Sequence, residues 1–193
     1  MAAAEVTCQL GYHRGVDFTF VSGNLGLDLA GTVGHRRNER VEMLASPQDL
    51  GRWVVAAGLL DTPPAVTGDD LRHAVALREA IYRLATAARR GEPLPGPDRE
   101  RLNTAAAPPP AGVTLTADGL ERTGDLPAAM SSAARAAIEL LGGPGRDLIR
   151  ECEAAPCTRL YVDASHRRTR RWCDMRGCGN RAKAAAFRAR HQQ

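Results

Sequence analysis

The chain has 193 residues, a formal net charge of +4, and a hydrophobic fraction of 44% of which little is aromatic. This length fits one large domain, or a medium domain with a small module. No apolar run of about 18 residues is present, which argues against a membrane span. The first residues lack a charged start followed by an apolar stretch, so we expect no secretion signal and a cytoplasmic protein with reduced thiols.

Two segments near the start of the chain differ in how clearly their sequence predicts secondary structure. Residues 17–33 are ambiguous, because a turn at Gly23-Asn24 would make a hairpin while the apolar spacing from Leu25 suits a helix. Residues 46–58 are clearer. They begin with Ser-Pro-Gln-Asp, which supplies an N-cap, a first-turn proline and a first-turn acid, and they end near a glycine. A helix is predicted there.

The middle of the chain is predicted to be helical with one hairpin. Apolar residues at helical spacing run through 67–91, between a Thr-Gly start and a closing glycine, and a shorter helix is expected at 98–106. Residues 113–123 alternate around an Asp-Gly turn, which is a hairpin signal. An aspartate caps a last helix over 125–141. We therefore expect a mainly α fold with a small β-hairpin component, and a helical N-terminal domain over residues 1–145.

Some polar residues of this domain interrupt apolar segments. Arg78 falls on the apolar face of its helix, and Asp28 lies within an apolar stretch. A charged group in such a place needs a partner. An internal pair of the Arg78–Asp28 type would supply one, and a small-molecule site between the helices would be the alternative. The candidate ligand-binding residues are Asn24, Asp28, Arg36 and Arg78.

Four of the five cysteines lie near the end of the chain, in the pattern C-x(4)-C-x(15)-C-x(4)-C. Thiolates supplied in pairs by two short loops suit the tetrahedral site of a structural zinc ion. Glycines on both sides of the last cysteine tolerate the tight backbone of a metal knuckle. The predicted zinc ligands are Cys152, Cys157, Cys173 and Cys178.

Other interpretations of the four cysteines are two disulfides, an iron–sulfur cluster, or unrelated buried thiols. A reducing compartment disfavours disulfides, and nothing else in the sequence indicates redox chemistry. Four cysteines would close the coordination shell of a zinc ion, which disfavours a catalytic zinc that keeps an open position. Cys8 lies far from the cluster and is expected to be a small buried or terminal residue.

The segment around these cysteines is predicted to fold as a treble-clef-like zinc finger over residues 146–193. We expect a strand within 158–165, a return strand at 168–172, and a helix that begins near Gly179-Asn180. Asn180 is a candidate cap for this helix, and Ala184 with Phe187 would pack inward. So small a module has little core, so the metal would supply most of its folding free energy.

The finger is also strongly basic. Residues 157–193 hold ten Arg and Lys against two Asp, whereas the preceding part of the chain is net acidic. This asymmetry indicates a polyanion-binding module, and phosphate contacts are the main contacts expected. A basic surface that binds RNA nonspecifically, or docks on the acidic body, is the alternative. The predicted nucleic-acid-binding residues are Arg167, Arg168, Arg170, Arg171, Arg181, Lys183, Arg188 and Arg190.

The stretch YVDAS followed by RRWCDMRGCGNRAKAAAFRAR resembles the CGNR zinc-finger family, whose name is spelled by residues 178–181. The segments SGNLGLDLAGTV, SPQDLGRWVVAAGLL and ALREAIYRL resemble the ABATE domain that accompanies this finger. The resemblance implies a bacterial regulator with a helical sensory or assembly domain and a DNA-binding finger. This chain has Gly31-Thr32 where that domain usually has Asn-Thr, and His166-Arg167 where an Arg-Asn pair is common.

Three functional hypotheses follow. The first is a transcription regulator whose finger binds DNA and whose body senses a ligand or forms a homodimer. The second is an RNA- or ribosome-associated adaptor. The third, an enzyme housed in the body, is disfavoured because His13, His35 and His73 are scattered and no paired-carboxylate, nucleophile or phosphate-loop motif lies near them.

Overall fold

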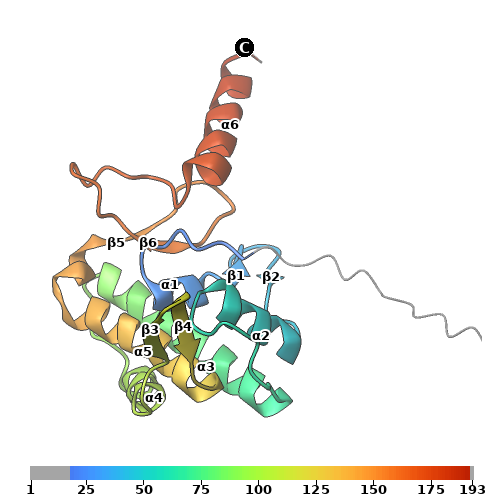
Figure 1. Ribbon diagram of the computed structural model, residues 1–193. Coiled ribbons are helices and arrows are strands. Elements are labelled where there is room, and N and C mark those ends of the chain that lie inside the picture. The colour runs from blue at the N-terminus through green and yellow to red at the C-terminus, as the bar shows by residue number, and fades with distance from the viewer. Residues whose placement is uncertain (1–17, 192–193) are drawn as a thin grey trace, which may run out of the picture.

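The computed structural model describes residues 18–191, which form a helical body with an arm that projects from it (Figure 1). The elements, in chain order, are α1 (Leu25–Ala30), β1 (Val33–Gly34), β2 (Val41–Glu42), α2 (Pro47–Ala56), α3 (Gly68–Arg89), α4 (Gly96–Ala106), β3 (Gly112–Thr116), β4 (Gly119–Thr123), α5 (Leu126–Gly142), the 3-10 turn η1 (Pro144–Leu148), β5 (Ile149–Glu151), β6 (Leu160–Val162), the π turn η2 (Met175–Gly179) and α6 (Asn180–His191). The mainly α fold with small antiparallel strand pairs is as predicted.

Local capping explains where the main helices begin. Ser46 and Asp49 form a reciprocal capping box at the start of α2, and Thr67 and Asp70 form another at the start of α3. In each box the hydroxyl of the Ser or Thr accepts from the backbone amide of the Asp three residues later. The carboxylate of that Asp accepts from the backbone amide of the Ser or Thr. Two of the four orphan amides at each helix start are thereby satisfied. Asp125 caps α5 in a simpler way, by accepting from the Ala128 amide.

The ambiguous segment at the start of the described chain folds as the helix α1 instead of a hairpin. Asn24 is its N-cap, and its side-chain oxygen accepts from the amides of Gly26 and Leu27. The side-chain nitrogen of Asn24 donates to the Ala136 carbonyl of α5 at 2.8 Å. Gly26 faces α5 so closely that a Cβ there would lie 2.6 Å from the Cβ of Ala137. This close packing holds α1 against the body.

The core of the body is one apolar cluster to which α1 to α5 all contribute. Helices α3 and α5 run through its middle, and α1, α2 and α4 pack around them (Figure 1). Much of the cluster is alanine and leucine, which allows close helix packing. Its largest fully buried apolar side chains include Trp53, Leu27, Leu29, Leu50, Ile81 and Leu84.

Over residues 18–191, the strands form three separate two-stranded antiparallel sheets. The predicted hairpin is present as β3–β4, with Thr116 opposite Gly119 and a two-residue loop between them. The predicted pairing within the finger is wrong, because β6 pairs with β5 upstream and residues 168–172 form no strand. Asp163 lies directly after β6, and its carboxylate accepts from the amides of Ser165 and Arg170. These bonds turn the chain, so the residues that follow do not return as a strand beside β6.

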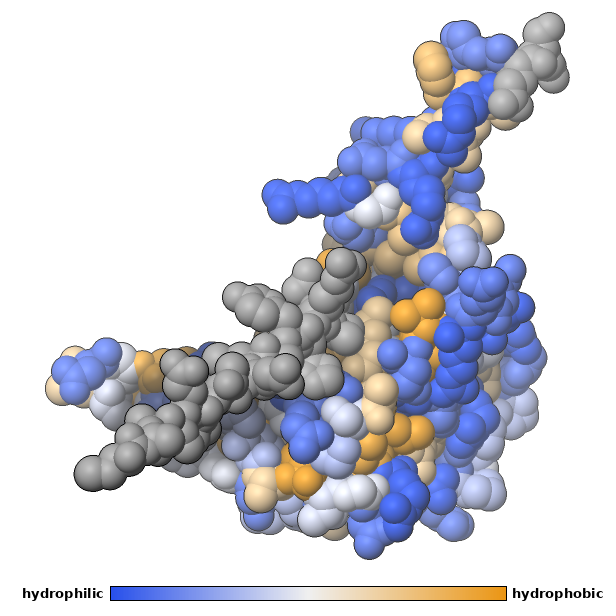
Figure 2. Space-filling model, turned by 90° about the vertical axis from the view of Figure 1, so that its right-hand side faces the viewer, coloured by the Kyte–Doolittle hydropathy of each residue, from blue (hydrophilic) through white to orange (hydrophobic). Residues whose placement is uncertain are grey.

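Helix α6 is the projecting arm, and it buries none of its residues (Figures 1 and 2). The expectation that Ala184 and Phe187 pack inward is therefore wrong, and the Phe187 side chain is 55% exposed. The predicted cap is also wrong. Asp174, before the π turn, accepts from the Gly177 amide, whereas the Asn180 side chain donates to the Arg176 carbonyl.

Within residues 18–191, no helix has the length and hydropathy that a membrane crossing requires.

Candidate metal centre and nucleic-acid interface

The four predicted cysteine ligands come from two chain segments that meet at the base of α6. Cys152 and Cys157 lie in the loop of the β5–β6 hairpin. Cys173 precedes the π turn, and Cys178 lies in it, two residues before α6 begins. The arrangement is a knuckle in a hairpin loop facing a second pair at a helix start. This is the ligand layout expected of a treble-clef-like finger.

The sulfur atoms are as close as a single tetrahedral ion requires. All four lie within 4.8 Å of one another. The Sγ atoms of Cys173 and Cys178 are 3.6 Å apart, and those of Cys157 and Cys173 are 3.8 Å apart. A tetrahedron with Zn–S bonds of about 2.3 Å has S···S edges of about 3.8 Å. The donor set and its spacing thus fit zinc with all four positions filled by protein.

Charge also favours a cation at this point. Burial and the negative charges of neighbouring Cys157 and Cys152 raise the pKa of the Cys178 thiol to about 12. Four thiolates this close therefore need a bound cation to remain deprotonated together. Arg181 adds positive charge from outside, because its guanidinium lies 3.2 Å from the Cys178 sulfur. Arg181 thus contacts a metal-ligating sulfur and is also one of the exposed cations of α6.

The backbone around the sulfurs is held tightly. The Cys173 amide donates to the Cys152 sulfur at 3.4 Å, as amides do in thiolate sites. A Cβ on Gly179 would lie 2.9 Å from the Met175 sulfur and 3.4 Å from the Trp172 ring. Trp172 itself is half-buried and packs against the cysteine cluster. The Trp172 ring therefore covers one side of the cysteine cluster, and the part of the ring in this contact is not exposed to solvent.

The loop between β6 and the second cysteine pair is organised by two buried side chains. Asp163 is fully buried, and its carboxylate accepts from the Ser165 and Arg170 amides, each at 3.0 Å. Although burial raises the pKa of Asp163, hydrogen bonds from the Ser165 hydroxyl and from these two amides keep it below its usual value. Tyr161 donates its hydroxyl to the Arg170 carbonyl at 2.5 Å.

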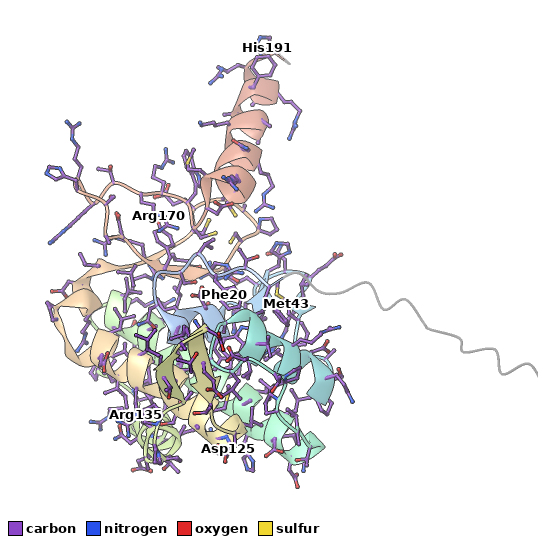
Figure 3. The ribbon with its side chains drawn as sticks, in the orientation of Figure 1. Phe20, Met43, Asp125, Arg135, Arg170 and His191 are labelled. Carbon is purple, nitrogen blue, oxygen red and sulfur yellow. The ribbon has the colours of Figure 1, made fainter. Side chains whose placement is uncertain are left out.

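Arg170 differs from its predicted role, because its guanidinium faces the interior of the finger (Figure 3). Nε donates to the Trp172 carbonyl at 2.9 Å, and Nη2 donates to the Val21 carbonyl at 3.0 Å and to the Cys173 carbonyl. The guanidinium also lies 4.4 Å from the centre of the Tyr161 ring. A side chain with these contacts joins finger to body and is not free for phosphate.

The other predicted basic residues lie at the surface. Arg171 is exposed but pairs with Glu153 at 2.6 Å and stacks over Trp172. Arg167 and Arg168 are exposed on the loop after β6. Among the described residues, the cations of α6 beyond Arg181 form no ion pair; they are Lys183, Arg188 and Arg190. Arg176 in the π turn is a further exposed cation, which the predicted nucleic-acid-binding set does not include.

The finger is joined to the body by backbone and charged contacts. The Val162 amide of β6 donates to the Ser22 carbonyl at 2.7 Å. Arg159 donates to the carbonyls of Thr19 and Gly31, and a Cβ on Gly31 would lie 2.4 Å from its Nη1. Gly31 therefore makes room for the Arg159 side chain. On the opposite side, Glu151 of β5 pairs with Arg89 of α3 at 2.8 Å.

The four candidate ligand-binding residues are occupied by internal contacts. Arg78 is fully buried and pairs with Glu42, through bonds of 2.6 and 2.8 Å, and with Glu79 at 2.9 Å. Arg36 also pairs with Glu79, and its guanidinium lies 4.0 Å from the centre of the Tyr82 ring. Arg36 and Arg78 therefore share one carboxylate partner, Glu79.

The expected Arg78–Asp28 pair is not formed. Asp28 accepts from the Ser22 amide at 3.0 Å, and burial raises its pKa. Asn24 serves as the helix cap described above. Arg78 finds its carboxylates on β2 and on its own helix instead, because those two elements face the same buried position.

A cavity of about 620 Å³ lies elsewhere, between α3, α4 and α5. Its floor is apolar, with Leu77, Leu126 and Met130, and its lining also contains His73 and Arg101. None of the four predicted ligand residues lines it. Cys8 and His13 lie outside the residues that the structure describes.

Comparison with family models gives two matches. Residues 23–144 match the ABATE family, described as "Putative stress-induced transcription regulator", and residues 149–191 match the CGNR zinc finger. No curated protein matches the chain. The finger match and the clustered sulfurs together identify zinc as the cofactor. The two families together indicate a zinc-binding regulator. The chain belongs to the ABATE family and ends in a CGNR zinc finger.

Proposed function

We propose that the protein is a transcriptional regulator that binds duplex DNA through its zinc finger, with α6 as the main contact element. The observation that carries the proposal is the exposure of α6. The helix projects from the body, buries none of its residues and carries four cations and no acid (Figure 2). A helix with this composition is free to enter a groove and contact phosphates.

The cations of α6 lie on two opposite lines. Residues seven apart fall on nearly the same side of a helix with 3.6 residues per turn, so Arg181 lies in line with Arg188. Lys183 lies in line with Arg190 in the same way, about half a turn from the first line. One flat phosphate surface would reach only one line. A helix lying in a major groove has a phosphate backbone on each side, which matches both.

The sides between these lines differ in chemistry. One side is entirely small and apolar, and it consists of Ala182, Ala185, Ala186 and Ala189. The other carries Phe187 and His191, whose rings stack with centroids 4.0 Å apart. The alanine side allows close approach to base edges, and alanine can contact thymine methyl groups. The proposal assigns phosphate contacts to the cations and groove contact to the alanine side.

The zinc site's role in this function is structural. When bound, zinc closes the four-thiolate site and supplies no open coordination position. The protein's own residues fix the direction of the arm, because Cys178 lies two residues before α6 and Arg170 joins the segment at Cys173 to the body. We propose no catalytic role for the chain. The body would serve as a regulatory domain, and its cavity between α3, α4 and α5 is the site we propose for a small molecule.

The proposal is tested by selection from randomised duplex DNA, with a randomised RNA pool in parallel. We expect enrichment of a short duplex motif by the zinc-loaded full chain. Enrichment of RNA without a DNA motif would favour an RNA- or ribosome-associated adaptor and would refute the regulator proposal. Absence of enrichment in both pools would refute nucleic-acid recognition altogether.

Paired variants locate the contact surface. Lys183→Ala with Arg190→Ala removes one line of cations and leaves zinc ligands and body contacts intact, so we expect weaker DNA binding with unchanged zinc content. Arg90→Ala with Arg99→Ala removes two exposed cations from the body, outside the cavity lining, and serves as the matched control. Equal loss of affinity in both double variants would show that only total charge matters.

A further inference from the structure

The β3–β4 hairpin exposes apolar side chains that the fold leaves uncovered. Val113 is 67% exposed, Leu115 is 87% exposed and Leu120 is 49% exposed. Side chains alternate along a strand, so Val113 and Leu115 share one face of β3, and Leu120 lies opposite Leu115 on β4. Contiguous exposed apolar side chains of this kind usually mark an interaction site.

The two edges of this hairpin are not equivalent. Among the described residues, β3 and β4 form a sheet with no third strand. The outer edge of β4 is partly used, because the Arg122 amide donates to the Asp61 carboxylate at 2.7 Å. β3 has no such partner, and four of its five residues are exposed. Its edge also lacks the proline or charged residues that normally block strand addition.

The register of the hairpin shows which backbone groups of β3 point outward. The Arg122 amide faces Asp61 and therefore points away from β3, so Arg122 and its partner Val113 form a non-hydrogen-bonded pair. Pairs alternate along an antiparallel ladder, so Leu115 and Leu120 form another. The amide and carbonyl groups of Val113 and Leu115 therefore both point outward at the free edge.

We infer that this edge pairs with the β3 edge of a second copy of the chain, about a two-fold axis at Thr114. Antiparallel pairing centred there places Val113 opposite Leu115 of the partner, and Leu115 opposite Val113 of the partner. The outward groups of these residues then meet in two hydrogen-bonded pairs, which gives four backbone hydrogen bonds. The same pairing brings the exposed apolar side chains of both chains together on one face of a four-stranded sheet.

Charge selects β3 over β4 for this contact. β3 contains no charged residue, so no like charges meet across its two-fold axis. The equivalent pairing of two β4 strands about Glu121 would set the two Glu121 carboxylates directly opposite each other, which is destabilising. It would also displace Asp61 from the Arg122 amide. A second copy joined through β3 is therefore the occupant that both the charges and the free backbone groups favour.

The small size of the surface indicates a weak dimer. A stable interface normally buries about 800 Å² on each partner. A strand of five residues spans only about 17 Å and offers three exposed apolar side chains. We expect a concentration-dependent equilibrium in the micromolar range that does not involve the finger. The inference is thus independent of what α6 binds.

Sedimentation velocity on the zinc-loaded full chain, from roughly 1 μM to 1 mM, tests the equilibrium directly. We expect a dimer to form as concentration rises. Thr114→Lys would place two cations on the axis and raise the dissociation constant at least about tenfold. Thr123→Lys puts the same charge on the same face of the hairpin, but on β4, and should leave the equilibrium unchanged. A monomer over the whole range, or equal effects of both variants, would overturn the inference.

Disulfide trapping tests the register without weakening the contact. Thr114→Cys should oxidise to a covalent dimer, because residues at a non-hydrogen-bonded pair have Cα atoms about 4.5 Å apart. Val113→Cys and Leu115→Cys chains should cross-link when mixed, and much less when each is alone. Wild type is oxidised under the same conditions as the control and should form no covalent dimer. A Thr114→Cys chain that also formed none would contradict pairing at this axis. Equal cross-linking of Thr123→Cys would do the same.

Discussion

Replacing Arg170 separates the role that the structure gives this residue from the role that its charge suggests. Arg170→Ala removes charge-assisted bonds to the carbonyls of Val21, Trp172 and Cys173, together with the cation–π contact to Tyr161. Arg167→Ala removes the same charge from an exposed position on the same loop. If Arg170 were a phosphate contact, the two variants would behave alike.

The magnitude follows from the contacts. A hydrogen bond from a charged donor contributes about 1.5–3 kcal/mol, and unpaired buried carbonyls add a penalty of similar size. Arg170 is partly exposed, so water recovers some of this loss, and a net cost of about 3 kcal/mol is reasonable. Since the metal and the fold of the finger are coupled, this cost corresponds to about a hundredfold weaker zinc binding.

The assay is competition with a chromophoric chelator, followed by DNA binding at saturating zinc. We expect Arg170→Ala to lose about a hundredfold in zinc affinity and Arg167→Ala to lose almost none. At saturating zinc, the Arg170 variant should bind DNA nearly as wild type does. Equal zinc affinities for the two variants would refute the structural role of Arg170.

Three further predictions concern the body and the metal. Gly26→Ala would force a methyl group into Ala137 across α1 and α5, and we expect a loss of about 1–3 kcal/mol in the free energy of unfolding, measured by urea denaturation. Although burial raises the pKa of Glu42, hydrogen bonds from Arg78 leave it below its usual value. This stabilisation is present above the unfolded-state pKa and is lost as pH falls through the lower folded-state value. Glu42→Gln should therefore destabilise the protein by about 2 kcal/mol at pH 7, and the difference from wild type should shrink below about pH 4; a constant difference would argue against the pair. Zinc removal should abolish amide-exchange protection in the finger while α3 and α5 stay protected, and unchanged protection in the finger would contradict a metal-dependent fold.

Features fixed by neighbouring residues were predictable from the sequence. The starts of α2 at Ser46 and of α3 at Thr67 were predicted, and in the structure each depends on a capping residue and an acid three positions later. The hairpin at β3–β4 depends on alternation and a short turn. The cysteine cluster depends on spacing alone, since four sulfurs in two pairs can reach one ion.

Features fixed by distant residues were not predictable. Arg78 was recognised as needing a partner, but its partner Glu42 comes from β2, far along the chain. The sequence does not distinguish Arg170 from the other arginines of this basic segment. Its role depends on carbonyl groups that only the folded chain brings around its guanidinium. The pairing of β6 was missed because its partner β5 lies upstream of the first cysteine of the cluster, whereas Asp163 ends β6 by accepting from the Ser165 and Arg170 amides.

The exposure of α6 was missed for a related reason. An alanine-rich helix with a phenylalanine has an apolar side that normally indicates core packing. Here only Ala182, at the base of the helix, packs against the cysteine cluster, and residues 183–191 are exposed. The same pattern that suggested burial is therefore consistent with a surface that meets a partner outside the chain.

We propose that zinc holds a projecting basic helix that binds duplex DNA through its phosphates. The most direct test is the slope of log affinity against log salt for the zinc-loaded chain and for the variant combining Lys183→Ala, Arg188→Ala and Arg190→Ala. Each lost phosphate contact should reduce the slope by about 0.9, so the account predicts a decrease of nearly 3 with zinc content unchanged. An unchanged slope would show that α6 does not contact the phosphates.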